Sequence, residues 1–153
     1  LKPNLPDRVN YINAETIAKE LGIQVELSYR NNDSNYQNII SACVKTKSRI
    51  YEISGSVFDH KNLRLINILG RDMEITPKGN MILLCNVDVP GVVGKIGTLF
   101  GRIGINIAAY LLSRNKANNE AFAVIRLERP LDNAEISELK KLDDIKWCYQ
   151  IKV

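Results

Sequence analysis

The chain has few of the residues that most often carry catalysis or hold metals, with three cysteines and one histidine among 153 residues. Cys43, Cys85 and Cys148 lie far apart in apolar segments, and an odd number at such spacing favours neither a disulfide framework nor a metal site. We expect all three to be buried, reduced thiols. His60 lies in a turn-like segment without a nucleophile pattern beside it, so no catalytic residue and no metal ligand is predicted.

Long apolar runs and blocks of like charge are also missing. No segment approaches the roughly 20 apolar residues of a membrane-spanning helix, and no basic segment followed by an apolar one opens the chain. We therefore expect a soluble, cytoplasmic protein without a membrane partner. The net charge of +4 is spread over both halves, and without clustered basic residues and stacking aromatic rings it does not predict a nucleic-acid partner.

The dinucleotide-binding fingerprint G-x-G-x-x-G after a strand is absent as well. The closest glycines, Gly91, Gly94 and Gly97, lie in a helical pattern, so no cofactor site is expected in this chain. Gly94, Gly97 and Gly101 would each cost the helix about 1 kcal/mol relative to alanine. We expect close backbone packing to offset that cost, first against the chain's own sheet and otherwise against a second copy.

The first half of the chain predicts one short helix and a run of strands. Asn13 is a candidate N-cap for a helix over residues 14–21, and Gly22 would end it. Strands are predicted at residues 23–29, 36–45, 49–58, 63–69 and 73–75, the last four joined as antiparallel hairpins. One helix cannot cover so large a sheet, so we expect an exposed face and a missing upstream part of this domain.

Residues 76–79 contain proline and glycine and are the best boundary between two domains, 1–78 and 79–153. The second domain predicts strands at 80–87, 105–114, 121–128 and 147–151, with helices at 91–103 and 134–142. This β-α-β-β-α-β order predicts a ferredoxin-like α+β fold with both helices on one face of an antiparallel sheet. Self-association would cover the remaining edge or face.

The run Asn86–Val93 joins the first strand of that domain to its first helix and predicts a pocket for an amino acid. Pro90 and Gly91 leave amides free to face a carboxylate, which the helix dipole favours. Asn86 and Asp88 share one strand face, where Asp88 can hold an ammonium group and Asn86 a hydroxyl or amine. The alternative is a strand-to-helix turn that Asp88 merely caps.

The stretch Met81–Ala109 resembles the ACT domain, a regulatory fold of amino-acid-controlled enzymes. The segments Asp7–Ala14, Val44–Thr46 and Ser54–Phe58, together with Gly91–Ala108, resemble D-3-phosphoglycerate dehydrogenase of the long bacterial type. The resemblance covers essentially the whole chain. It implies a partial allosteric substrate-binding domain followed by a complete ACT domain, as the regulatory part of an NAD-dependent enzyme whose catalytic domains lie outside this chain.

The resemblance also implies a ligand and its contacts. L-serine would act as feedback inhibitor, bound where the ACT domains of two subunits meet in a homo-oligomer. The residues that would line that site are Asn86, Asp88, Pro90, Gly91, Val92 and Asn106. Arg64 and Arg126 match basic positions that hold an anion in some family members, but Asp72 and Thr76 stand where such members carry further basic residues.

Two alternatives stay open. The regulatory part of an iron–sulfur L-serine dehydratase resembles the same pair of domains, although no cluster-binding segment adjoins them here. The β-α-β-β-α-β order also serves RNA recognition, but the two strands expected at the centre of the sheet offer only Phe122 as a stacking ring.

Overall fold

A computed structural model describes residues 9–29, 36, 38–59, 61–115 and 117–153. The chain divides into two compact units, residues 1–33 and residues 34–153. The segment that opens the chain, the loop 30–35 and His60 fall partly or wholly outside the described residues. No described helix is long and apolar enough to cross a membrane.

The first unit contains helix α1, Ala14–Glu20, close to the predicted range. Gly22 ends the helix in a left-handed conformation, with φ +70°, which favours glycine. The Gly22 amide donates to the Lys19 carbonyl and the Ile23 amide to the Ala18 carbonyl, the paired bonds of a Schellman motif. The predicted end of this helix is therefore confirmed.

The strand predicted at residues 23–29 is wrong, because this segment is neither helix nor strand in the structure. Its alternating pattern describes which side chains would face a core. A strand also needs a neighbour whose backbone completes its hydrogen bonds. Among the described residues no such neighbour pairs with this segment.

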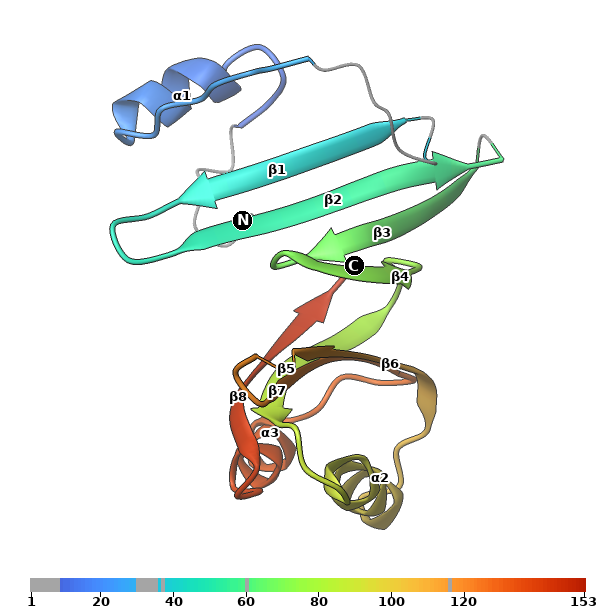
Figure 1. The fold of residues 1–153 in the computed structure, drawn as a ribbon. Coiled ribbons are helices and arrows are strands. Elements are labelled where there is room, and N and C mark those ends of the chain that lie inside the picture. Colours follow the sequence, from blue (N-terminus) through green and yellow to red (C-terminus); the bar gives the residue numbers. More distant parts are fainter. Residues whose placement is uncertain (1–8, 30–35, 37, 60, 116) are drawn as a thin grey trace. The chain divides into compact units, whose positions relative to one another are not determined.

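The second unit begins with a four-stranded antiparallel sheet in the order β1-β2-β3-β4 (Figure 1). Its strands are β1 (Ile39–Lys45), β2 (Ile50–Phe58), β3 (Asn62–Ile68) and β4 (Arg71–Ile75). The predicted hairpins are thereby confirmed, although β1 starts three residues later than predicted. One face of this sheet is exposed: Ile40, Val44 and Leu63 all lie open to solvent. The missing upstream part stays a prediction.

A second antiparallel sheet follows after residues 76–79, in the order β6-β7-β5-β8. Its elements are β5 (Asn80–Val87), α2 (Val92–Arg102), β6 (Ile107–Asn115), β7 (Glu120–Leu127), α3 (Asn133–Lys140) and β8 (Ile145–Lys152). The α+β class and the β-α-β-β-α-β order are therefore confirmed. The domain division at residues 76–79 stays a prediction.

Two apolar clusters hold the second sheet on its two faces. On one face, Ile82 and Leu84 of β5 pack with Ile96 and Phe100 of α2. Figure 1 shows both helices on that face, with α3 towards β8 and α2 towards the opposite side. Alternate residues of β5 and β7 face the other way, where they join the first sheet in a cluster of Ile68, Met73, Ile75, Met81, Phe122 and Val124.

Two packing predictions need correction. Cys43 is exposed, because β1 is open to solvent on both faces along most of its length. Cys85 and Cys148 are buried, and all three thiols are free. A Cβ atom added at Gly94, Gly97 or Gly101 would meet nothing within 4 Å, so these glycines do not pack against the chain's own sheet. Packing against a second copy stays a prediction.

Candidate functional site

Asn86 lies near the end of β5 and carries an unsatisfied acceptor. Its side chain is 3% exposed and shares the strand face of Ile82 and Leu84, which pack against α2. The Asn86 Nδ2 donates to the Val87 carbonyl at 2.6 Å. Its Oδ1 is buried and has no hydrogen-bond partner among the described residues. Because an unpaired buried acceptor costs about 1–3 kcal/mol, a ligand hydroxyl or amine would gain by donating to it.

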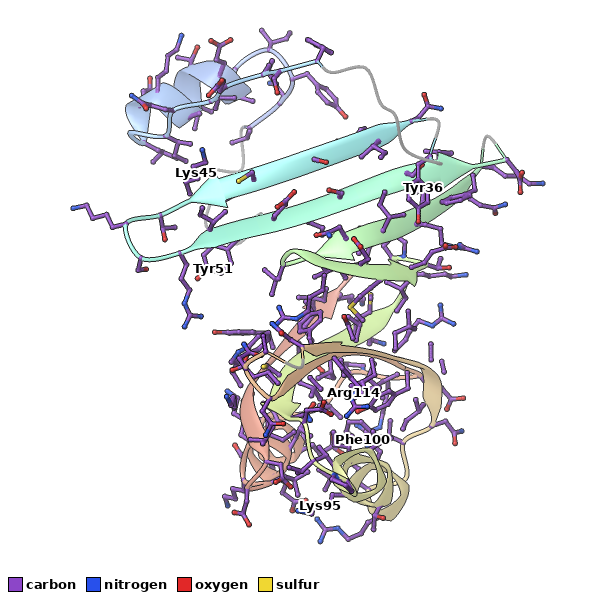
Figure 2. All side chains as sticks on the ribbon, in the orientation of Figure 1. Tyr36, Lys45, Tyr51, Lys95, Phe100 and Arg114 are labelled. Carbon is purple, nitrogen blue, oxygen red and sulfur yellow. The ribbon has the colours of Figure 1, made fainter. Side chains whose placement is uncertain are left out.

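Asp88 follows β5 and is held from two directions. Its backbone amide donates to the Asn119 carbonyl at 3.0 Å. Its carboxylate Oδ2 accepts from Arg114 Nε at 2.7 Å. The Asp88 side chain is 13% exposed, whereas that of Arg114, labelled in Figure 2, is 58% exposed, so the carboxylate is largely buried and the guanidinium side chain is mostly exposed.

The first turn of α2 has free backbone amides, as the sequence predicts, but the helix begins one residue later than predicted. Gly91 is the N-cap, with φ +93°, and the helix begins at Val92, so Pro90 precedes the helix instead of starting it. Only glycine adopts that conformation easily. The Gly91 carbonyl accepts from the Lys95 amide at 2.9 Å, while the amides of the first helical turn have no partner within the helix. These amides give the N-terminus of α2 a positive potential, which favours binding of an anion.

The carboxylate of Asp88 does not cap this helix. Among the described residues its hydrogen bond goes to Arg114, and the N-cap Gly91 has no side chain to contribute. The interpretation of Asp88 as a mere cap is therefore wrong, and its charge is balanced by an exposed guanidinium.

A second ion pair braces the same turn. Lys95 Nζ of α2 lies 2.5 Å from Asp144 Oδ2, and the Asp144 carbonyl accepts from the Val87 amide at 2.8 Å. The hydrogen bond to Asp144 raises the pKa of Lys95. Residue 144 thus ties the end of β5 to the first turns of α2.

Asn106 lies at the other end of the sheet from Asp88. Ile107 at the start of β6 pairs with Leu127, whereas Val87 at the end of β5 pairs with Glu120. The eight residues of β7 separate these two positions by roughly 25 Å. Asn106 instead donates to Glu128 Oε2 at 3.0 Å. One copy therefore brings together Asn86, Asp88, Pro90, Gly91 and Val92, but not Asn106.

Arg114 is the site residue that the sequence analysis missed. It stands at the end of β6, which is not a neighbour of β5, because β7 lies between them. The pairing of both strands with the start of β7 brings Arg114 and Asp88 within reach. A weak signal was present, since an arginine closes an apolar strand there.

The two arginines predicted for anion binding lie in different surroundings. Arg64 Nη1 donates to Thr76 Oγ1 at 2.6 Å, and Arg64 Nε lies 3.6 Å from Glu74 Oε1, so this guanidinium is already engaged. Arg126 is half-buried on β7 and forms no hydrogen bond or ion pair with the described part of the chain. An anion site at these two residues stays a prediction.

The RNA-binding alternative loses the ring on which it depended. Phe122 is fully buried and packs against Trp147, with 5.8 Å between the ring centroids. A ring in that position is not available to stack on a base.

Residues 1–69 match the D-3-phosphoglycerate dehydrogenase intervening domain. This chain resembles the C-terminal region of D-3-phosphoglycerate dehydrogenase. The resemblance predicted from the sequence is thus confirmed.

The relatives carry that enzyme's name in bacteria and archaea. The chain is 30% identical to D-3-phosphoglycerate dehydrogenase of Bacillus subtilis (strain 168) over 145 residues, 95% of this chain. It is 30% identical to that of Archaeoglobus fulgidus over 94% of this chain, and 28% identical to that of Synechocystis sp. over all of it. The chain spans 28% of the length of each of these relatives.

Proposed function

We propose that this chain is the regulatory part of an NAD-dependent D-3-phosphoglycerate dehydrogenase, a cytoplasmic oxidoreductase of L-serine biosynthesis. In this proposal residues 79–153 form an ACT domain that binds L-serine as feedback inhibitor, and NAD binds to catalytic domains outside this chain. The relatives support the enzyme family, and their shared name favours the dehydrogenase over the L-serine dehydratase alternative.

The chemistry of the β5–α2 turn fits a small hydroxylated amino acid. The Asp88 carboxylate suits its ammonium group, and the amides at the start of α2 suit its carboxylate. The observation that carries the proposal is the buried Asn86 Oδ1, which lacks a donor among the described residues. A serine hydroxyl can supply that donor, whereas an alanine methyl group cannot.

Two copies are needed to complete the site. The sheet order leaves β6 at an edge, paired on one side only. Antiparallel pairing of two β6 strands about a two-fold axis would bring the start of one strand beside the end of the other. Asn106 of a second copy would then lie at the end where Arg114 and Asp88 meet. This arrangement resolves the separation of Asp88 and Asn106 within one chain.

Binding between two copies supplies a route to regulation. A ligand that contacts both copies favours the arrangement in which they are close, and shifts the population towards it. Catalytic domains joined to the two regulatory parts would receive that shift as an inhibitory bias.

Calorimetric titration with L-serine tests the proposal. We expect saturable binding by the wild-type chain, weaker binding of glycine and D-serine, and loss of binding in Asp88→Ala. Asp72→Ala, which removes an exposed carboxylate from β4, is the matched control and should bind normally. Absence of binding in a folded, dimeric sample would contradict the proposal.

A further inference from the structure

The two side chains of the Asp88–Arg114 ion pair differ in burial and in how firmly the fold holds them. Asp88 is fixed by its own backbone bond to Asn119 and is largely buried, whereas most of the Arg114 side chain lies in solvent. Arg114 uses Nε for the bond to Asp88. Its two Nη groups form no hydrogen bond with the described part of the chain.

The structure assigns to Arg114 the role of a specificity residue that selects zwitterions, an inference that rests on the proposed function. An α-amino acid can enter the existing ion pair by giving its ammonium group to Asp88 and by sharing its carboxylate between the guanidinium and the amides at the start of α2. The planar, fork-shaped guanidinium is suited to bidentate carboxylate binding, and its exposed side chain is free to turn towards the ligand.

The charge balance explains the selectivity. The Asp88–Arg114 pair is neutral before binding, and a zwitterion is neutral too, so the exchange leaves each of the four charges with a partner. An amine without a carboxylate must instead displace Arg114 from Asp88 and offers the guanidinium nothing in return. A carboxylate without an amine leaves Asp88 to compete with it for the same arginine.

Arg114 therefore acts in opposite directions on two kinds of ligand. For L-serine it contributes a charge-assisted hydrogen bond, and its loss should weaken binding about tenfold or more, which corresponds to a loss of at least about 1.4 kcal/mol. For ethanolamine, which has the ammonium and hydroxyl groups of serine but no carboxylate, Arg114 is only a competitor for Asp88. Its loss should leave ethanolamine binding equal or tighter.

Titration of L-serine and ethanolamine into wild type, Arg114→Gln and Arg114→Lys tests the assignment. Arg102→Gln is the matched control, because it removes another exposed arginine that is paired with a carboxylate, Glu138, at 2.6 Å. We expect the ratio of L-serine to ethanolamine affinity to fall about tenfold or more in Arg114→Gln, to fall less in Arg114→Lys, and to stay constant in Arg102→Gln.

The outcomes separate the two proposals. Normal L-serine binding by wild type with an unchanged ratio in Arg114→Gln overturns the role of Arg114 and leaves the serine site standing. No L-serine binding by wild type overturns both. If Arg114→Gln does not fold, the Arg114→Lys ratio decides the question, because lysine keeps the charge but not the fork.

Discussion

Arg71 of β4 lies over the ring of Phe122 on β7, with 5.5 Å between the guanidinium carbon and the ring centroid. The Arg71 Nη2 also lies 3.9 Å from Glu120 Oε2, and Lys146 Nζ lies 2.7 Å from Glu120 Oε1. These contacts sit at the rim of the apolar cluster in which the two sheets meet. A cation over an aromatic face outside bulk water is stabilising by about 1–2 kcal/mol.

We predict that Phe122→Ala destabilises the chain by about 3–5 kcal/mol, because it leaves a cavity in that cluster. Arg71→Ala should cost about 1 kcal/mol. Urea unfolding followed by circular dichroism measures both values. Tyr149→Ala is the control, because it removes an exposed aromatic ring from β8. Equal losses for Phe122→Ala and Tyr149→Ala would show that the cluster between the sheets does not contribute to stability.

Acid should lower the stability of the folded chain through Glu135 at the start of α3. Hydrogen bonds from Arg129 and from the Asp132 backbone lower the pKa of Glu135 from 4.5 to about 2. Because the folded pKa is depressed, the contribution is present at neutral pH and is lost as pH falls from about 4.5 towards 2. When unfolding is measured across that pH range, the free energy of unfolding should fall less for Glu135→Gln than for wild type.

The control for this pH effect is Glu52→Gln on β2, which should keep the wild-type dependence on acid. A Glu135→Gln chain with an unchanged pH profile would mean that the bonds from Arg129 and Asp132 do not set the acid stability of this helix.

The three cysteines should differ in reactivity. Cys43 is exposed, while burial raises the pKa of Cys85 and Cys148 and keeps their thiols protonated. A chromogenic disulfide reagent should therefore modify one thiol quickly in the folded chain and all three after unfolding. Cys43→Ser should abolish the fast phase. A fast phase that persists in Cys43→Ser would contradict the burial of the other two.

Gly97 tests whether a second copy packs on α2. An added Cβ meets nothing within 4 Å in a single copy, so Gly97→Ala should stabilise the isolated chain by about 0.5–1 kcal/mol. If copies meet at this helix, the same change should weaken their association. Sedimentation across a range of concentrations measures the association constant. A value for Gly97→Ala equal to that of wild type would exclude α2 from the contact between copies.

The order of elements in residues 79–153 could be predicted because each segment carries its own period and each is closed by a turn. The apolar run of β5 was placed at its observed bounds, since a strand buried on both faces is apolar throughout. The segment 23–29 shows the limit of that approach. Alternation predicts which side chains would be buried, but a partner strand decides whether a strand forms.

The sequence alone could indicate only those residues of the proposed site that are close in sequence. Asn86, Asp88 and Gly91 could be proposed because strand parity and helix-start chemistry are local properties. The role of Arg114 depends on the register of β6 and β5 against β7, which no local pattern specifies. The same register places Asn106 away from Asp88 and makes the second copy part of the proposed site.

Complementation between two inactive variants tests the central claim most directly. Asp88→Ala and Asn106→Ala should each fail to bind L-serine when alone. A mixed dimer has one site built from the intact Asp88 of one copy and the intact Asn106 of the other. Mixing and re-equilibrating the two variants should therefore restore L-serine binding in the calorimeter. A mixture that binds no more L-serine than the separate variants would contradict a site shared between two copies.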